Sequence, residues 1–128
     1  MARKITLKPL EKIIIAGAVI TNGKDKTNLM IANKVPVLRQ KDIMTEKSAN
    51  TPCRRIYLVI QLMYIDRKNI KTYHNNYWQL VRELISAAPS TLNLIDAISG
   101  KILADQYYKA LKLTQKLIEY EQEVLKSV

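Results

Sequence analysis

The longest apolar stretch in the chain covers residues 56–65, IYLVIQLMYI, in which Gln61 is the exception. A segment without a polar face has to be buried on all sides. It is too short to cross a membrane, because a spanning helix needs about 20 apolar residues. Although Ile, Val and Tyr also favour strands, Thr51 followed by Pro52 is typical of a helix start, where a hydroxyl caps the first turn and proline needs no N–H. The pattern predicts a buried helix over residues 52–66.

Short apolar segments separated by turn residues precede this helix. The first alternates over residues 5–7, and a β-branched run over residues 12–20 follows. Residues 29–31 and 35–38 are apolar again. Segments of this length between turn residues are typical of strands. The N-terminal part of the chain therefore predicts four or five short strands in a small, strongly curved antiparallel sheet.

Glycine, asparagine and proline mark the turns of this predicted sheet. Pro9 ends the first strand, and Asn22-Gly23 is a dipeptide that favours a tight hairpin turn. Gly17 interrupts the β-branched run, which indicates a bulge. Pro36 places its strand at an edge or at a bulge, because proline cannot donate to the ladder.

Three further helices follow the buried one. Residues 70–88 carry aromatic and aliphatic side chains at spacings of three and four, and Pro89 ends this helix. Ser90 or Thr91 can cap a third helix, and Asp105 caps the last one. The last helix has a wide apolar stripe, which packs on a bundle or on a partner. Its members at alternating spacings of three and four are Ala110, Leu113, Leu117, Tyr120 and Val124.

These patterns predict an α+β protein with a small basic antiparallel β-sheet or half-barrel at the N-terminus and a four-helix C-terminal portion. A chain of 128 residues is most often one domain, and it can bury about two-thirds of its unfolded-chain surface. We therefore predict a single domain over residues 1–128. It consists of a basic β subdomain over residues 1–45 and a helical subdomain over residues 46–128.

Positive charge is concentrated near the start of the chain. The chain carries 21 Lys and Arg against 11 Asp and Glu, a formal net charge of +10. Residues 1–55 hold 12 of these bases and 4 of the acids, so they contribute +8. This asymmetry indicates a surface for a polyanion. A basic surface that only aids solubility is the alternative.

The sequence offers little for catalysis. His74 is the only histidine, so no second imidazole is available for a metal site or a triad. It stands between tyrosines on a predicted helix, where a surface or tyrosine-packed role fits better than that of a general base. The three glycines do not form a phosphate-binding loop. We predict no enzyme activity, no cofactor and no metal.

Two other reactive groups have structural interpretations. Cys53, the only cysteine, cannot form an intramolecular disulfide, which fits a reducing compartment. A helix N-terminus beside two arginines lowers the pKa of a thiol, but a structural or incidental thiol fits this sequence better than a nucleophile. Glu119, Glu121 and Glu123 are spaced by two and share no helical face, so we interpret them as solvated surface.

Basic side chains bracket the polar linker before the buried helix. Arginine pairs with phosphate through two hydrogen bonds and stacks on bases. All eight aromatic residues lie at Tyr57 or beyond, so the basic segment lacks the stacking surface common in RNA-binding sheets. Recognition would use arginines, backbone groups and RNA shape. The alternative for Arg54 and Arg55 is solvation, or a salt bridge to Asp42 or Glu46. The bracketing residues are Arg39, Lys41, Lys47, Arg54 and Arg55.

Several sequence blocks occur together in one order. They cover residues 17–23 (GAVITNG), 38–43 (LRQKDI), 51–52 (TP), 55–57 with 61–64, 87–91 (AAPST), and 108–111 with 117–121. Through these blocks the chain resembles the FlbT family of flagellum biosynthesis repressors over essentially its full length. Gln40 stands where an acidic residue is expected. The resemblance implies a post-transcriptional regulator that binds the 5′ untranslated region of flagellin mRNA and restrains its translation or stability.

Residues 11–13 and 35–43 have a fainter likeness. They resemble the strand edges of the carbon storage regulator family, small strand-exchanged dimers that bind mRNA leaders. This likeness implies that Arg39 contacts RNA and that residues 4–7 form the other contact edge. A helical N-terminal half, or an Arg39 buried in an intrachain salt bridge, would overturn it.

We therefore expect a cytoplasmic regulator of flagellar biosynthesis, since the N-terminus lacks the apolar region of a signal peptide. Its expected partner is the flagellin mRNA leader, and no membrane partner is expected. The competing interpretation is a protein-interaction module that docks flagellin or an export-associated regulator through the helical half, and a homodimer is a further alternative. The predicted RNA-binding residues are Lys4, Arg39, Lys41, Arg54 and Arg55.

Overall fold

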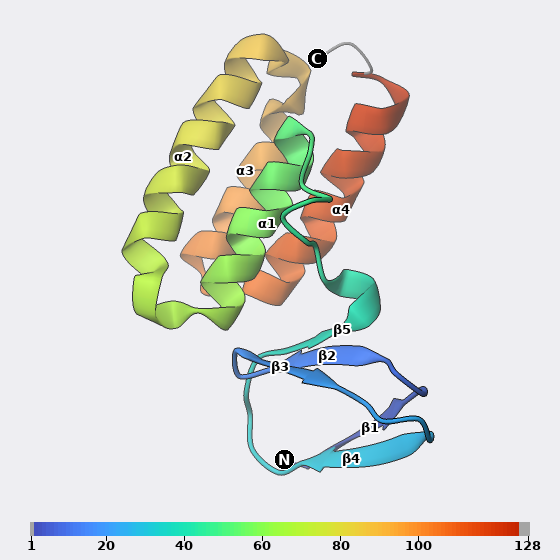
Figure 1. Ribbon diagram of the computed structural model, residues 1–128. Coiled ribbons are helices and arrows are strands. Elements are labelled where there is room, and N and C mark those ends of the chain that lie inside the picture. Colours follow the sequence, from blue (N-terminus) through green and yellow to red (C-terminus); the bar gives the residue numbers. More distant parts are fainter. Residues whose placement is uncertain (1, 126–128) are drawn as a thin grey trace. The chain divides into compact units, whose positions relative to one another are not determined.

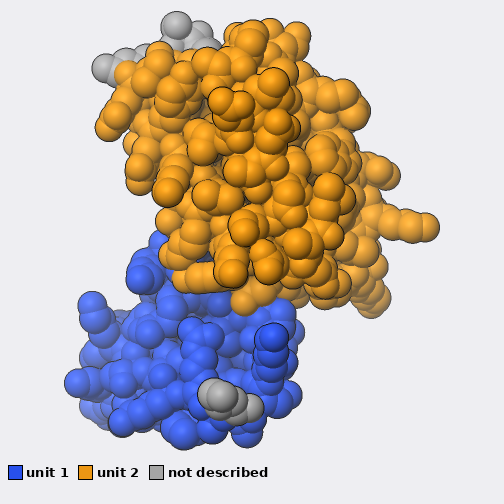
Figure 2. All heavy atoms as spheres, turned by 180° about the vertical axis from the view of Figure 1, so that it is seen from behind, with its two compact units in different colours: residues 1–43 blue, residues 44–128 orange. Residues whose placement is uncertain are grey.

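The computed structural model describes residues 2–125 and divides the chain into two compact units, residues 1–43 and residues 44–128 (Figure 2). Strands make up the first unit, and the second is helical (Figure 1). The predicted α+β class, with an N-terminal β portion and four C-terminal α-helices, is confirmed. Among the described residues, no helix is long and apolar enough to span a membrane.

The first unit contains two small antiparallel sheets (Figure 1). In one sheet, β1 (Arg3–Leu7) pairs with β4 (Thr27–Ile31). In the other, β2 (Lys12–Ile15) lies between β3 (Ala18–Thr21) and β5 (Val37–Arg39). A short 3₁₀ helix, η1 (Gln40–Asp42), follows β5. The strands therefore form two sheets in place of the single curved sheet that we expected.

Alternation along the strands builds the core of this unit. Ile5 and Leu7 of β1 are buried in one cluster with Ile13 of β2 and Val37 of β5. Successive side chains of a strand point to opposite faces, so the intervening Thr6 faces away from this cluster. Its hydroxyl donates a hydrogen bond of 2.8 Å to Asn28 Oδ1 on the paired strand. Ile5 and Leu7 thus lie on the buried face of the β1–β4 sheet, and the opposite face carries Thr6 and Asn28 together with Lys4 and the exposed Met30.

The tight hairpin forms at a different dipeptide from the one predicted. Ala16 and Gly17 have φ angles of 51° and 87°, and they join β2 to β3. Two successive positive φ angles are typical of a type I′ turn, so Gly17 is a turn residue and not a bulge. Asn22-Gly23 lies in the longer connection to β4, where Asn22 Nδ2 donates to Lys8 O at 2.8 Å and to Asp25 O at 3.0 Å. The Asn22 side chain therefore connects the β1–β2 loop to the connection between β3 and β4.

The edge position predicted from Pro36 is correct. Pro36 immediately precedes β5, which is an edge strand of the three-stranded sheet. Its carbonyl accepts a hydrogen bond of 2.9 Å from Ala16 N. The missing N–H of proline therefore falls outside the ladder.

The predicted buried helix is present as α1 (Pro52–Ile65). Thr51 caps it, because its hydroxyl oxygen accepts the Arg54 N–H at 3.2 Å, and Pro52 occupies the first turn. Gln61, the polar exception, is buried and satisfied. Its amide donates to Met44 O at 3.0 Å and accepts from Met44 N at 2.7 Å. These two hydrogen bonds attach the backbone at Met44, in the segment before α1, to the helix.

Three helices pack with α1 in the second unit (Figure 1). They are α2 (Ile70–Ala87), α3 (Leu92–Leu103) and α4 (Tyr107–Glu123), and the 3₁₀ turns η2 (Arg67–Asn69) and η3 (Pro89–Thr91) precede α2 and α3. Helix α1 contacts α2 and α4, and α4 also contacts α3. The apolar face of α4 is therefore used within the bundle.

Asp105 ends α3 and does not cap α4. Its φ angle is 62°, and its N–H donates to Ile102 O at 3.0 Å while Gln106 N donates to Lys101 O at 2.8 Å. This pair of bonds is the Schellman arrangement that closes a helix C-terminus. An aspartate just before a helix is typical of an N-cap, but Asp105 is instead part of the turn that closes the C-terminus of α3.

Candidate nucleic-acid interface

The five residues predicted to bind RNA are divided between the two units. Lys4, Arg39 and Lys41 belong to the strand unit, and Arg54 and Arg55 belong to the first turn of α1 in the helical unit. Lys4 is exposed on β1, opposite Met30 of β4. The structure brings Arg39 and Lys41 together at the edge of one cavity.

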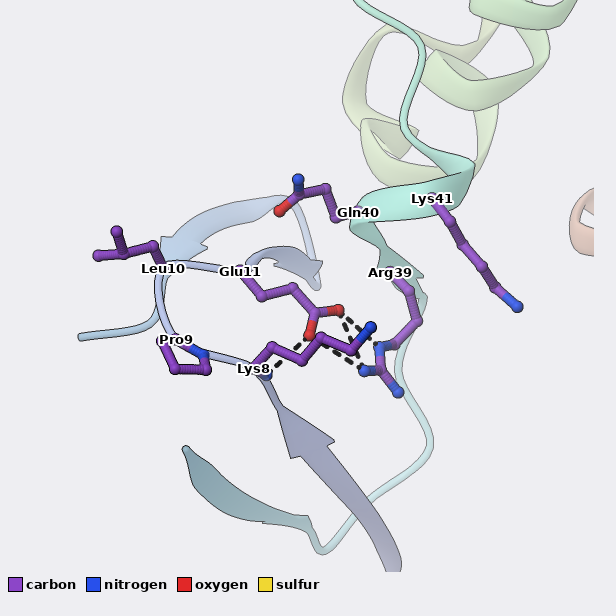
Figure 3. Close-up of a pocket in the computed structure, with 7 residues that line it drawn as sticks. All are labelled: Lys8, Pro9, Leu10, Glu11, Arg39, Gln40 and Lys41. Carbon is purple, nitrogen blue, oxygen red and sulfur yellow. Dashed lines mark hydrogen bonds and ion pairs between the residues drawn. The ribbon is translucent and has the colours of Figure 1, made fainter. Parts of the chain in front are cut away.

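This cavity has a volume of about 710 Å³ and lies within the strand unit (Figure 3). Its walls come from the β1–β2 loop and from the junction of β5 with η1. Three of its side chains are basic and one is acidic, so its net charge is positive. The lining residues are Lys8, Pro9, Leu10, Glu11, Arg39, Gln40 and Lys41. We call this cavity the Arg39 pocket.

Arg39 is held in place by the Glu11 side chain, which Figure 3 shows, and by the backbone of Thr6. Its Nη2 donates to Glu11 Oε2 at 3.0 Å and to Thr6 O at 2.7 Å, and its Nε donates to Glu11 Oε2 at 3.3 Å. The side chain keeps 33% of its surface exposed. An arginine in this position is preorganised by the fold and still reachable from solvent.

The ion pair bears on the fainter likeness to the carbon storage regulator family. We expected a buried intrachain salt bridge at Arg39 to overturn that likeness. The salt bridge exists, and the N-terminal unit is made of strands, but Arg39 is only partly buried. The RNA contact implied by that likeness stays a prediction.

Glu11 is the acidic member of the pocket. The Lys8 N–H donates to Glu11 Oε1 at 2.9 Å, and this bond is the main cause that lowers the pKa of the carboxyl. Burial acts in the opposite direction, and the hydrogen bond and charge of Arg39 add to the lowering. Glu11 is therefore anionic at neutral pH.

Gln40 has a structural role beside the pocket. Its Oε1 accepts the Lys12 N–H at 2.6 Å, which ties the start of η1 to β2. This bond fixes the backbone between Arg39 and Lys41. A neutral amide at this position accepts a backbone donor without adding negative charge next to the two cations.

Lys8 is a pocket residue that the sequence did not single out. It precedes Pro9 in the β1–β2 loop, 31 positions before Arg39, and no local pattern links the two residues. Glu11 connects the two residues, because its carboxylate accepts the Lys8 N–H and forms the ion pair with Arg39. The sequence signal was limited to the general excess of basic residues.

The arginines of α1 have different surroundings. Arg54 Nη1 donates to Asn50 Oδ1 at 3.1 Å, four residues earlier, and its side chain is partly buried. Arg55 is exposed. Both flank the capped N-terminus of α1, but neither is part of the Arg39 pocket.

The thiol and the imidazole have little reactive potential. Cys53 is buried, and burial raises the pKa of its thiol, with the nearby Glu121 carboxylate raising it further. This reverses the lowering that two adjacent arginines suggested. His74 Nε2 lies 3.4 Å from Tyr107 Oη, which fits the predicted tyrosine-packed role. Within residues 2–125 no group of three or more His, Cys, Asp or Glu is suited to hold a metal.

The interpretation of Glu121 as solvated surface is wrong. Its side chain is buried, and its Oε2 accepts the Cys53 N–H at 3.1 Å. A carboxylate can be buried at a helix N-terminus because free N–H groups and the helix dipole stabilise it there. Spacing along α4 could not reveal this, because the stabilising group belongs to α1.

Comparisons with known proteins agree on one family. The family model described as "Flagellar protein FlbT" matches residues 4–125. The chain is 45% identical over 125 residues to the probable flagellum biosynthesis repressor protein FlbT 1 of Bradyrhizobium diazoefficiens, a match that covers 97% of this chain and 85% of that protein. It is 43% identical to the probable flagellum biosynthesis repressor protein FlbT of Rhodopseudomonas palustris strain TIE-1, with 98% of both chains covered.

A third relative is the flagellum biosynthesis repressor protein FlbT of Caulobacter vibrioides strain CB 15. It is 40% identical over 127 residues, which are 98% of this chain and 90% of that protein. No solved structure shows a significant match to this chain. A family model and relatives that span nearly its whole length show that the chain belongs to the FlbT family of flagellar proteins.

Proposed function

We propose that this protein regulates flagellar biosynthesis by binding the 5′ untranslated region of flagellin mRNA and repressing its translation or stability. Membership of a family whose relatives are named flagellum biosynthesis repressors supports the regulatory role. The observation that carries the RNA contact is the Arg39 pocket, where three basic side chains line one cavity. Because translation takes place in the cytoplasm, the proposal implies a cytoplasmic protein.

Charge in the strand unit supports an RNA partner. Residues 1–43 contain nine Lys and Arg against three Asp and Glu, a net charge of +6 on one third of the chain. Among the described residues of this unit, Arg39 is paired with one of the three acids. Lys4 and Lys41 are exposed, so their charges can neutralise phosphates.

Arg39 suits a phosphate contact because it already holds an anion. The Glu11 carboxylate occupies two of its nitrogens, in the geometry that a phosphate group also accepts. A phosphate of the RNA can share or replace this carboxylate, and Lys8 and Lys41 line the same cavity. The proposed contact is therefore a polar pocket for the RNA backbone, with Arg54 and Arg55 as a second basic segment.

The alternative is a module that docks flagellin or another flagellar regulator through the helical unit. That alternative relied on the apolar stripe of the last helix. In the structure α4 packs against α1 and α3, and Ala110 and Leu117 of this stripe are fully buried, while Val124 at its end is exposed. The RNA proposal consequently has the stronger structural support. A homodimer stays a prediction.

The test is binding of the full-length protein to a flagellin 5′ leader and to a scrambled RNA of equal length. Measurements at about 0.15 M salt screen weak surface electrostatics. We expect a clear preference for the leader, and a steep fall of affinity with salt, with a logarithmic slope of about −0.7 per phosphate contact on single strands. Equal weak binding to both RNAs, or a flat salt response, would contradict the proposal.

Variants then locate the site. Lys8→Ala, Lys41→Ala and the double variant Arg39→Ala with Arg54→Ala should weaken binding to the leader. Lys34→Ala is the matched control, because it removes one positive charge from the same unit and Lys34 is outside the Arg39 pocket. If Lys34→Ala weakens binding as much as Lys8→Ala and Lys41→Ala do, the contact is a diffuse basic surface and not this pocket.

A further inference from the structure

The outer face of the β1–β4 sheet carries a small group of side chains that are not part of the Arg39 pocket. In the register of these two paired strands (Figure 1), Lys4 lies opposite Met30, and Thr6 lies opposite Asn28. Side chains two positions apart on a strand share a face, so the four residues form one patch of about 5 Å by 7 Å. We call it the Asn28 patch.

Asn28 has a fixed orientation in this patch. The Thr6 hydroxyl donates to its Oδ1 at 2.8 Å, and the Asn28 side chain forms no other hydrogen bond within residues 2–125. Because Asn28 is exposed, both N–H groups of Nδ2 and the second lone pair of Oδ1 are free for a ligand. An amide in this state can donate one hydrogen bond and accept another at the edge of a nucleic-acid base.

The other members of the patch suit the ring and the phosphate of a nucleotide. Met30 keeps 66% of its surface exposed, and its polarisable thioether can pack against an aromatic ring. Lys4 is exposed beside it, and neither β1 nor β4 contains an acidic residue. The acid nearest to β4 along the chain is Asp25, which lies in the turn before the strand. The charge of the patch is therefore positive, which favours an anionic ligand.

The patch is next to the Arg39 pocket. Arg39 Nη2 donates to the carbonyl oxygen of Thr6 at 2.7 Å, so Thr6 contacts Arg39 through its backbone and Asn28 through its side chain. RNA that is held by a phosphate at Arg39 has a neighbouring base within reach of Asn28. One residue thus connects the proposed phosphate contact to an oriented amide.

We propose that the Asn28 patch selects the base sequence of the bound RNA. Asn28 hydrogen-bonds the edge of one unpaired base, Met30 packs against the ring of that base, and Lys4 contacts a phosphate. Thr6 is a positioning residue, because it orients the amide. The inference rests on the proposed function and adds a base contact to it, since phosphate contacts carry no sequence information.

The experiment compares the affinities of the full-length protein for a flagellin 5′ leader and for a scrambled RNA of equal length. We expect Asn28→Ala to reduce the preference for the leader roughly tenfold, because a base contact with two hydrogen bonds is lost. The dependence of affinity on salt should not change in this variant. Lys4→Gln should instead weaken both RNAs alike and reduce the logarithmic salt slope by about 0.7.

Thr6 variants test the positioning role. Thr6→Val removes the hydroxyl and keeps the shape of the side chain, so it should lower the preference in the same direction as Asn28→Ala. Thr6→Ser keeps the hydroxyl and should restore the preference. Asn33→Ala is the matched control, because Asn33 is an exposed asparagine of the same unit outside β1 and β4. Thermal unfolding of each variant separates a loss of binding from a loss of fold.

The outcomes distinguish this inference from the proposed function. If the wild type prefers the leader and Asn28→Ala keeps that preference, the inference is overturned and the proposed function stands. The same conclusion follows if Asn28→Ala weakens both RNAs by one factor, since the patch then contacts RNA without selecting its sequence. If the wild type binds both RNAs equally, the proposed function fails and the inference fails with it.

Discussion

The Thr51 hydroxyl donates a hydrogen bond of 2.6 Å to Glu121 Oε1, across 70 residues of sequence. The same hydroxyl oxygen accepts the Arg54 N–H, and Glu121 Oε2 accepts the Cys53 N–H. The last turn of α4 thereby completes the cap of α1. A negative group at this position is favourable, since helix N-termini carry unsatisfied N–H groups and a positive dipole end.

This shared cap should contribute to stability. Thr51→Ala removes the side-chain cap and should lower the free energy of unfolding by about 1 kcal/mol. Glu121→Ala leaves a buried N–H without its partner and should cost about 2 kcal/mol. Denaturant unfolding measures both, and a double-mutant cycle gives their coupling. Glu119→Ala, on an exposed position of the same helix, should change stability by less than about 0.5 kcal/mol.

The β2–β3 hairpin offers a test of backbone strain. Gly17→Ala places a methyl group at a φ of 87° and should destabilise the protein by about 1 kcal/mol. Ala16→Asn should stabilise it by up to about 1 kcal/mol, because asparagine tolerates a positive φ in a type I′ turn. At Gly23 an added methyl would meet no heavy atom within 4 Å, so Gly23→Ala is the control. Equal effects of the two glycine variants would contradict the turn assignment.

The interactions of Glu11 should make the free energy of unfolding depend on pH in the acidic range. Its pKa in the folded state is below the ordinary value of 4.5, chiefly through the Lys8 N–H. A carboxyl with a lowered pKa stabilises the fold above its unfolded pKa, and this contribution is lost as the pH falls through the folded pKa. Glu11→Gln should therefore be less stable than the wild type at neutral pH. The difference should shrink between roughly pH 5 and pH 3; a constant difference over this range would count against the assignment.

Glu11 should also limit access of phosphate to Arg39. Glu11→Gln removes the carboxylate that competes for the guanidinium and adds one unit of positive charge to the pocket. Affinity for the flagellin leader should therefore rise, by a few-fold at about 0.15 M salt. Asp25→Asn adds the same charge to the strand unit but leaves the Arg39 pocket unchanged, which makes it the control. A rise of equal size in both variants would indicate a general charge effect.

Cys53 should react slowly in the folded protein. Its thiol is buried and its pKa is raised, so little thiolate is present near neutral pH. Iodoacetamide should alkylate it many times more slowly in the native state than in concentrated guanidinium. Between about pH 7 and pH 9 the native rate should rise less than that of free cysteine. A fast native reaction at pH 7 would show that the thiol is accessible.

Local sequence signals gave a good account of the secondary structure. Thr51 and Pro52 marked the start of α1, and the short apolar segments marked the strands, because capping, proline geometry and side-chain periodicity act within a few residues. The same signals were misleading where two turns competed. Asn22-Gly23 has the stronger hairpin propensity, but strand pairing used Ala16-Gly17 and left Asn22 to bind three carbonyl groups.

The candidate sites depended on the tertiary structure. The sequence showed that the first part of the chain is basic, and it identified Arg39 and Lys41. It could not show that Glu11 holds Arg39 or that Lys8 lines the same cavity, since β-strand pairing brings these segments together.

By itself, the sequence determined the order of strands and helices, the buried character of α1 and the uneven charge, since these follow from residue types and their spacing. Only the tertiary structure decided which polar groups are buried and paired. Glu121 is the clearest case, because its burial depends on the N-H groups of a helix that begins about 70 residues earlier. A polar side chain is stable in the interior only when its partners are in place, and those partners come from distant parts of the chain.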